Sequence, residues 1–204
     1  MSLKKFQTIF TFITCVDSAG AEFIAMTGCV TKTCWRRSGK HSNISARILM
    51  SDPYASHMEF LIKHCSRAQV ILELGCGKYS TPLFLNQKLF PEVRLVVSVE
   101  SDQEWADKVM AANPDPRLEL VVVSEPFEDK LVNMNLSDYD LIFVDHATDP
   151  VTRARTIEYL AHNVTTSRVV IHDYENQEYR DAAKGFSHIL IDGFRTPHTA
   201  MVWK

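Results

Sequence analysis

The 204-residue chain is 46% hydrophobic and 23% charged, a balance typical of one globular domain that buries its core without disulfides or metals. Its formal net charge of −3 gives no indication of a surface for nucleic acid. No stretch is long and apolar enough to span a bilayer. Composition therefore favours a small-molecule ligand over a nucleic-acid or membrane partner, and leaves the oligomeric state open.

The cysteines indicate a reducing compartment. They are odd in number and show no Cys-x-x-Cys spacing, so neither a disulfide framework nor a zinc site is indicated. We interpret all of them as reduced thiols in a cytoplasmic protein: Cys15, Cys29, Cys34, Cys65 and Cys76.

Residues 1–50 are expected to form an N-terminal extension. Lys4, Lys5 and the apolar residues 6–16 loosely imitate a secretory signal. The alternative that we favour is a hairpin of residues 6–16 and 21–30, joined by the turn-forming residues 17–20. Residues 31–47 are basic and poor in large apolar side chains, which indicates an exposed loop.

Residues 51–204 alternate between short apolar runs and segments with helical spacing, after a helix that Asp52 and Pro53 are expected to open. The predicted strands are 70–74, 95–99, 118–123, 141–144 and 169–171, followed by 186–191 and 199–203. The predicted helices are 82–90, 103–113, 127–134 and 151–163. The pattern predicts an α/β domain with a doubly wound, mostly parallel, Rossmann-like sheet of seven strands, closed by an antiparallel C-terminal edge hairpin.

Ligands of open α/β sheets bind outside the carboxyl ends of the strands, so the residues there carry the functional information. The first strand is followed by a turn in which Gly75 and Gly77 let the backbone approach a ligand, and Ser80 or Thr81 can cap the next helix. A glycine-rich turn without a ligand is the alternative.

Acidic side chains accompany this turn. Glu100 ends the second strand, where a carboxylate can accept hydrogen bonds from both ribose hydroxyls, whereas Asp102 is better placed to cap a helix. A dinucleotide site requires a third glycine where Ser80 stands. Glu73, just before the turn, can attract the cationic amino or sulfonium end of S-adenosylmethionine. These features favour a cationic nucleoside cofactor over a pyrophosphate.

These residues resemble class I S-adenosylmethionine-dependent methyltransferases. Residues 71–77 (Ile-Leu-Glu-Leu-Gly-Cys-Gly), 97–100 and 139–145 are similar to the family's motifs at the first, second and fourth strands. The resemblance begins near Asp52, and the family's third glycine is replaced by Tyr79. It implies an S-adenosylmethionine-binding domain over residues 51–204, with cofactor-binding candidates Glu73, Gly75, Cys76, Gly77, Ser80, Glu100, Ser101, Ser124 and Asp145.

Two pairs of polar residues follow the next strands, Asp145 with His146 and His172 with Asp173. We expect them to meet in one pocket, where a neutral histidine takes a proton from the methyl acceptor and an aspartate orients it. The alternative is that both histidines hydrogen-bond loops.

The same aspartates allow a metal to be considered. Asp145-His146 resembles the corresponding pair of catechol-type O-methyltransferases, which hold magnesium, but Tyr174 and Thr148 stand where that pattern has asparagine and lysine. We therefore expect no metal ligands and do not favour magnesium.

The sequence thus predicts an S-adenosylmethionine-dependent methyltransferase that acts on oxygen or nitrogen of a small molecule. One alternative is an NAD-type nucleoside-binding oxidoreductase, against which the missing third glycine argues. The other is a non-catalytic methyltransferase-like binding protein, which the altered turn around Tyr79 keeps open. The methyl acceptor itself cannot be predicted, because acceptor pockets are built from variable loops.

Overall fold

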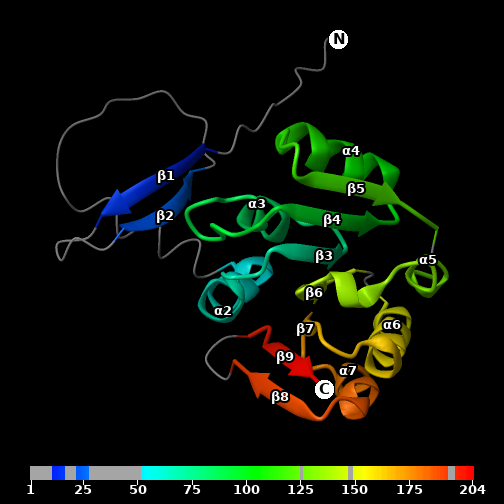
Figure 1. The fold of residues 1–204 in the computed structure, drawn as a ribbon. Helices are drawn as coiled ribbons and strands as arrows, with labels where there is room; N and C mark the ends of the chain where they lie inside the picture. Colours follow the sequence, from blue (N-terminus) through cyan, green and yellow to red (C-terminus); the bar gives the residue numbers. More distant parts are fainter. Residues whose placement is uncertain (1–10, 17–21, 28–51, 125, 147–148, 193–195) are drawn as a thin grey trace, which may run out of the picture. The chain divides into compact units, whose positions relative to one another are not determined.

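The computed structural model describes residues 11–16, 22–27, 52–124, 126–146, 149–192 and 196–204 (Figure 1). The chain divides into two compact units, Met1–Ala55 and Ser56–Lys204. Within the described residues, no helix has both the length and the hydropathy that crossing a membrane requires.

The first unit contains a hairpin within the predicted ranges 6–16 and 21–30, of which residues 11–16 and 22–27 are described. Strands β1 (Thr11–Val16) and β2 (Glu22–Thr27) are antiparallel and pair from Thr11 with Thr27 to Val16 with Glu22. The predicted turn at 17–20 and the basic segment 31–47 lie outside the described residues.

The helix expected from Asp52 onwards begins later than predicted. Residues Pro53–Ala55 form the 3-10 turn η1, and helix α2 spans His57–Cys65. The side chain of Asp52 accepts a hydrogen bond from the backbone of Tyr54, so it caps the turn rather than the helix. Tyr54 is 77% exposed.

The second unit is built on the predicted seven-stranded sheet, in the order β5-β4-β3-β6-β7-β9-β8. Strands β3 to β7 are parallel to one another, and β9 is antiparallel to both β7 and β8. The strand order reverses between β4 and β6, on either side of β3. The strands are β3 (Val70–Leu74), β4 (Leu95–Glu100), β5 (Leu118–Val122), β6 (Leu141–Val144), β7 (Arg168–His172), β8 (His188–Ile191) and β9 (Thr199–Trp203).

Helices alternate with the parallel strands as predicted, but the bounds of two predicted helices are wrong and α7 (Gln177–Ala182) was not predicted. The segment 82–90 is the short helix α3 (Ser80–Phe84), because the backbone turns at Asn86, whose carbonyl accepts from Leu89 and Phe90. The segment 127–134 contains only one turn of helix. The remaining helical elements are α4 (Gln103–Ala112), α5 (Glu128–Leu131), η2 (Leu136–Asp138), α6 (Pro150–Asn163), α7 (Gln177–Ala182) and η3 (Ala183–Gly185).

The central strands of the sheet are buried on both faces, as continuous apolar strands require, whereas edge strand β8 is exposed. Leu72 and Leu74 of β3 belong to a core shared with α6 and α7, whereas Ile71 belongs to a second core shared with α2 and α3. Because successive side chains of a strand point to opposite faces, Glu73 lies on the same face as Ile71. This places its carboxylate beneath α3.

The glycine turn after β3 is tightly packed against the loop after β6. Gly75 adopts φ = 88°, and a Cβ there would lie 2.6 Å from the Cα of His146. Both the left-handed backbone and the close approach require glycine. The backbone N–H of Gly75 donates to Val99 at 2.8 Å, which fixes the turn against β4.

Candidate functional site

The predicted cofactor and acceptor residues follow β3, β4, β5, β6 and β7, which are parallel. Their carboxyl ends therefore lie at one edge of the sheet. The polar clusters described next are all at this edge.

The side chain of Glu73 stabilises the glycine turn through hydrogen bonds. Its Oε2 accepts hydrogen bonds from Ser98 and, at 2.8 Å, from Thr81, whose hydroxyl oxygen accepts the backbone N–H of Gly77 at 3.0 Å. Its Oε1 is buried with no hydrogen-bond partner among the described residues. Burial raises the pKa of Glu73 to about 7, against the opposing effect of hydrogen bonds from Ser80, Ser98 and Thr81.

This geometry corrects two sequence predictions. The side chain of Glu73 is fully buried, so it holds the turn in place and does not present its carboxylate directly to a ligand. Neither Ser80 nor Thr81 caps α3, because both hydroxyls turn inward to Glu73, and Tyr79 occupies the cap position without a side-chain hydrogen bond. Ser80 is buried and engaged in the same way.

Glu100 closes the other side of the turn. Its Oε1 accepts backbone N–H groups of Ser101 at 2.7 Å and Asp102 at 3.0 Å, while among the described residues Oε2 accepts only the thiol of Cys76, at 3.5 Å. The indole N–H of Trp105 donates to the Cys76 carbonyl at 2.7 Å. Glu100 therefore has one firmly held oxygen and one held by a weak donor.

The prediction that Asp102 caps the following helix is confirmed, since its side chain accepts the backbone N–H of Trp105 at the start of α4. Ser101 and Ser124 are exposed at the ends of their strands. Cys76 and Cys65 are free thiols, and burial raises the pKa of each, that of Cys65 to about 12. The other three cysteine side chains lie outside the description.

Asp145, His172 and Asp173 meet as predicted. His172 Nδ1 lies 3.2 Å from Asp145 Oδ1 and 3.5 Å from Asp173 Oδ1. Asp173 reaches this position through a left-handed backbone, φ = 57°, directly after β7. Arg153, from α6, bridges both carboxylates at 3.2 and 2.9 Å.

The charges of this cluster stabilise one another. Burial alone would raise the pKa of Asp145, but His172 and Arg153 lower it below its usual value. Burial alone would lower the pKa of His172, but its hydrogen bond to Asp145 and the two carboxylates raise it. Asp145 is thus an ionised carboxylate, and its side chain is 25% exposed.

His146 does not join the other three side chains, and that prediction is wrong. Its ring stacks on Phe127 with centroids 4.4 Å apart, and Nε2 lies 3.0 Å from the hydroxyl of Thr156. Burial lowers the pKa of His146 to about 3. Only its backbone belongs to the cluster, because the carbonyl accepts the Nε–H of Arg153.

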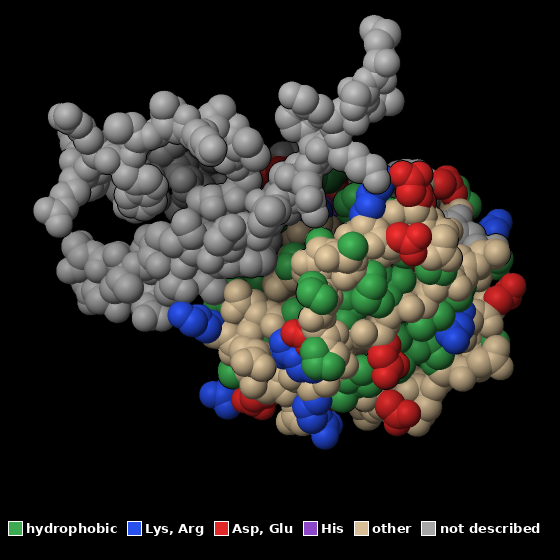
Figure 2. Space-filling model, turned by 90° about the horizontal axis from the view of Figure 1, so that it is seen from above, with side chains coloured by type: hydrophobic (Ala, Val, Ile, Leu, Met, Phe, Trp, Pro, Cys, Tyr) green, Lys and Arg blue, Asp and Glu red, His purple; other side chains and the backbone are tan. Residues whose placement is uncertain are grey.

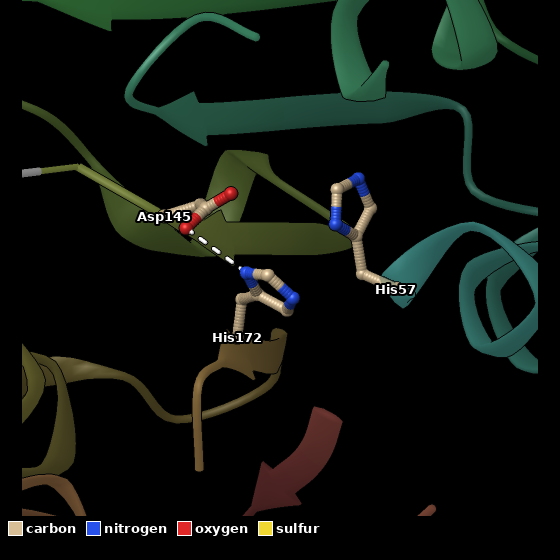
Figure 3. A group of neighbouring side chains, drawn as sticks. All are labelled: His57, Asp145 and His172. Carbon is tan, nitrogen blue, oxygen red and sulfur yellow. Dashed lines mark hydrogen bonds and ion pairs between the residues drawn. The ribbon is translucent and has the colours of Figure 1, made fainter. Parts of the chain in front are cut away.

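Sequence reasoning missed two members of the site. His57 opens α2 and lies beside His172, with ring centroids 4.8 Å apart in an edge-to-face arrangement (Figure 3). Arg153 lies on the buried face of α6. Each is a polar residue that shares a face with apolar residues three or four positions later, namely Phe60 and Leu61 for His57, and Ile157 for Arg153. That spacing in the sequence could have indicated that both side chains are buried.

The magnesium arrangement of catechol-type enzymes does not fit these residues. The guanidinium of Arg153 bonds one oxygen of Asp145 and one of Asp173, so it occupies the position between the two carboxylates that a shared magnesium ion would need. Tyr174, in the place of the asparagine ligand, is buried in the apolar core, and Thr148 lies outside the described residues.

A surface hollow of about 470 Å³ lies elsewhere. It is lined by Lys63, Arg168 and Trp203 among others, and Arg168 begins β7. This places the hollow at the amino end of that strand, away from the residues described above.

No protein-family model and no curated protein matches this sequence. Solved structures do match. Cofactor-bound Rv0187 from MTB is 19% identical with a TM-score of 0.55, over 81% of this chain and 90% of that one. The SAH-bound methyltransferase PaMTH1 of Podospora anserina is 14% identical with a TM-score of 0.52, over 85% and 100%.

A putative caffeoyl-CoA O-methyltransferase from Staphylococcus aureus is 15% identical with a TM-score of 0.52, over 81% of this chain and 94% of that one. The chain spans 64% of MtNAS, which it matches with a TM-score of 0.51 at 17% identity. At such identities the likeness concerns the fold. The chain has the class I S-adenosylmethionine-dependent methyltransferase fold.

Proposed function

We propose that the chain is an S-adenosylmethionine-dependent methyltransferase that acts on oxygen or nitrogen of a small molecule. The observation that carries the proposal is the convergence of the Gly75 to Gly77 turn and Glu100 at one sheet edge, beside the end of β6. Three solved structures with this fold carry a methyltransferase name or a bound cofactor in their descriptions.

Glu100 is the residue to which we assign the ribose. Its Oε2 can exchange the weak thiol donor Cys76 for ribose hydroxyls, which are stronger donors. The backbone of Gly75 to Gly77 would adjoin the amino-acid portion, and the exposed Ser101 and Ser124 flank the nucleoside. S-adenosylmethionine, when bound, supplies an electrophilic methyl group.

The chain's own contribution to the reaction would come from Asp145 with its partners His172 and Asp173. Asp145 is ionised and partly exposed, so it can hold the acceptor by a hydrogen bond. His172 and Arg153 fix the orientation of that carboxylate. Much of the rate of such a bimolecular transfer comes from alignment. As the methyl group leaves sulfur for the acceptor, the acceptor's proton would pass to Asp145, and His146 takes no part because its ring is buried elsewhere.

A small molecule remains the proposed acceptor. On the face in Figure 2, basic side chains are interspersed with acidic and hydrophobic ones and do not form one continuous patch. Nucleic-acid surfaces instead gather Lys and Arg. The competing functions, an NAD-type oxidoreductase and a non-catalytic binding protein, differ in the ligand that they bind.

Replacing Glu100 by alanine is expected to weaken S-adenosylmethionine binding by about 1.5–3 kcal/mol, the contribution of hydrogen bonds to a charged group. Isothermal titration calorimetry measures this change. Glu104→Ala is the matched control, because Glu104 is an exposed acid in the first turn of the following helix. Equal affinity of the Glu100→Ala and Glu104→Ala variants would show that the ribose assignment is wrong.

A further inference from the structure

His57 adds a third possible metal-ligand atom to those that Asp145 and His172 offer. His57 comes from the start of α2, Asp145 from the end of β6 and His172 from the end of β7. One ligand atom of each lies within 4.8 Å of those of the other two. Figure 3 shows the His57 ring facing the hydrogen-bonded pair of Asp145 and His172.

The ring nitrogens of His57 make no hydrogen bond to the described residues that would explain their burial. The side chain is 2% exposed, and neither ring nitrogen has a hydrogen-bond partner within the described part of the chain. A buried polar group without a partner costs about 1–3 kcal/mol. A neutral imidazole ring offers a lone pair on one of its two nitrogens.

The hydrogen bonds of His172 determine which of its two ring nitrogens faces His57 and Asp145 as a possible metal ligand. Ser56 donates its single hydroxyl proton to the carbonyl of Pro197 at 2.9 Å. Its hydroxyl oxygen must therefore accept from His172 Nε2, 2.9 Å away. His172 Nδ1 then faces oxygens of Asp145 and Asp173, an arrangement that needs a cation at Nδ1, either a proton or a metal ion.

We propose that His57, His172 and Asp145 form a binding site for a divalent transition-metal ion, of the class of Zn²⁺, Co²⁺ or Fe²⁺. Imidazole nitrogens select these ions over Mg²⁺, which takes oxygen ligands. The hydrogen bond from His172 Nε2 to Ser56 is the outer contact that commonly orients a ligating histidine. Ligand atoms around zinc lie roughly 3.4 Å apart, so side-chain shifts of about 1 Å close the site.

The test is titration of the chelator-treated full chain with Zn²⁺, Co²⁺ and Mg²⁺ without S-adenosylmethionine, so that its outcome is independent of the proposed methyl transfer. We expect one Zn²⁺ or Co²⁺ per chain and no measurable binding of Mg²⁺. Bound Co²⁺ should give ligand-field absorption without the intense charge-transfer band of a thiolate ligand. A thiolate band would place the ion on cysteine and overturn the proposal.

His57→Phe is the decisive variant, because it keeps an aromatic ring against Phe143 and removes only nitrogens that have no other described partner. It should fold as well as the parent. Loss of an outer-sphere partner alone weakens metal binding by about 10–100-fold, and loss of the ligand His57 should weaken Zn²⁺ binding by more than that. Ser56→Ala should fall within that range, and His64→Gln, on the same helix outside the cluster, should not change affinity. Unchanged binding by His57→Phe, or no binding by the parent chain, would overturn the site and leave a proton at His172 Nδ1.

Discussion

Replacing Arg153 by alanine is expected to lower the free energy of unfolding by about 3 kcal/mol. Arg153 is 5% exposed and bridges Asp145 and Asp173 while donating to the carbonyl of His146. Without Arg153, two carboxylates lose their ion-pair partner and the carbonyl of His146 loses its hydrogen-bond donor. Because both carboxylates keep some exposure to water, the loss should lie at the low end of the range for breaking a buried ion pair. Urea denaturation measures it.

Arg155→Ala is the matched control, since Arg155 lies two residues further along α6 and is exposed. It should change stability by no more than about 0.5 kcal/mol. Adding Asp173→Asn to Arg153→Ala should restore part of the loss, because it removes one of the uncompensated charges. Equal stability of the two arginine variants would mean that the bridge contributes nothing to the fold.

The second large effect is a dependence of stability on pH that comes from Glu73. Its pKa rises from an ordinary 4.5 to about 7 in the folded chain. Between these values the folded state keeps a proton that the unfolded state releases, so raising the pH lowers the free energy of unfolding. A shift of this size corresponds to a loss of roughly 3 kcal/mol between pH 4.5 and pH 8, most of it by pH 7.

Glu73→Gln removes the titrating group and should abolish that part of the pH dependence. The comparison is the difference in unfolding free energy between pH 5 and pH 8, measured for parent and variant. Glu119→Gln, an exposed acid on β5, should keep the slope of the parent. A Glu73→Gln variant with the same slope would show that the carboxylate does not carry the raised pKa.

The sheet could be predicted from sequence because its strands are continuous apolar runs. Residues 70–74, 141–144 and 199–203 form strands with the predicted bounds. Helix boundaries were less predictable where polar side chains have tertiary partners. Thr81 is a residue type that often caps helices, but its hydroxyl donates a hydrogen bond to Glu73, eight residues earlier in the chain.

The site was predictable to the extent that it follows strand ends. Asp145, His172 and Asp173 were found in this way, since parallel strands bring them to one edge. His146 also follows a strand, but its side chain points to α6, and position alone does not give that direction. His57 and Arg153 come from helices, so a search of strand ends could not find them.

The measurement that tests the central proposal most directly is a calorimetric titration of the full chain with S-adenosylmethionine, its demethylated product and NAD. Our account predicts saturable binding of the first two at one site per chain and none of NAD. Binding of NAD alone would replace the methyltransferase proposal with an oxidoreductase. Absence of binding by all three would contradict the cofactor site and favour a non-catalytic protein with this fold.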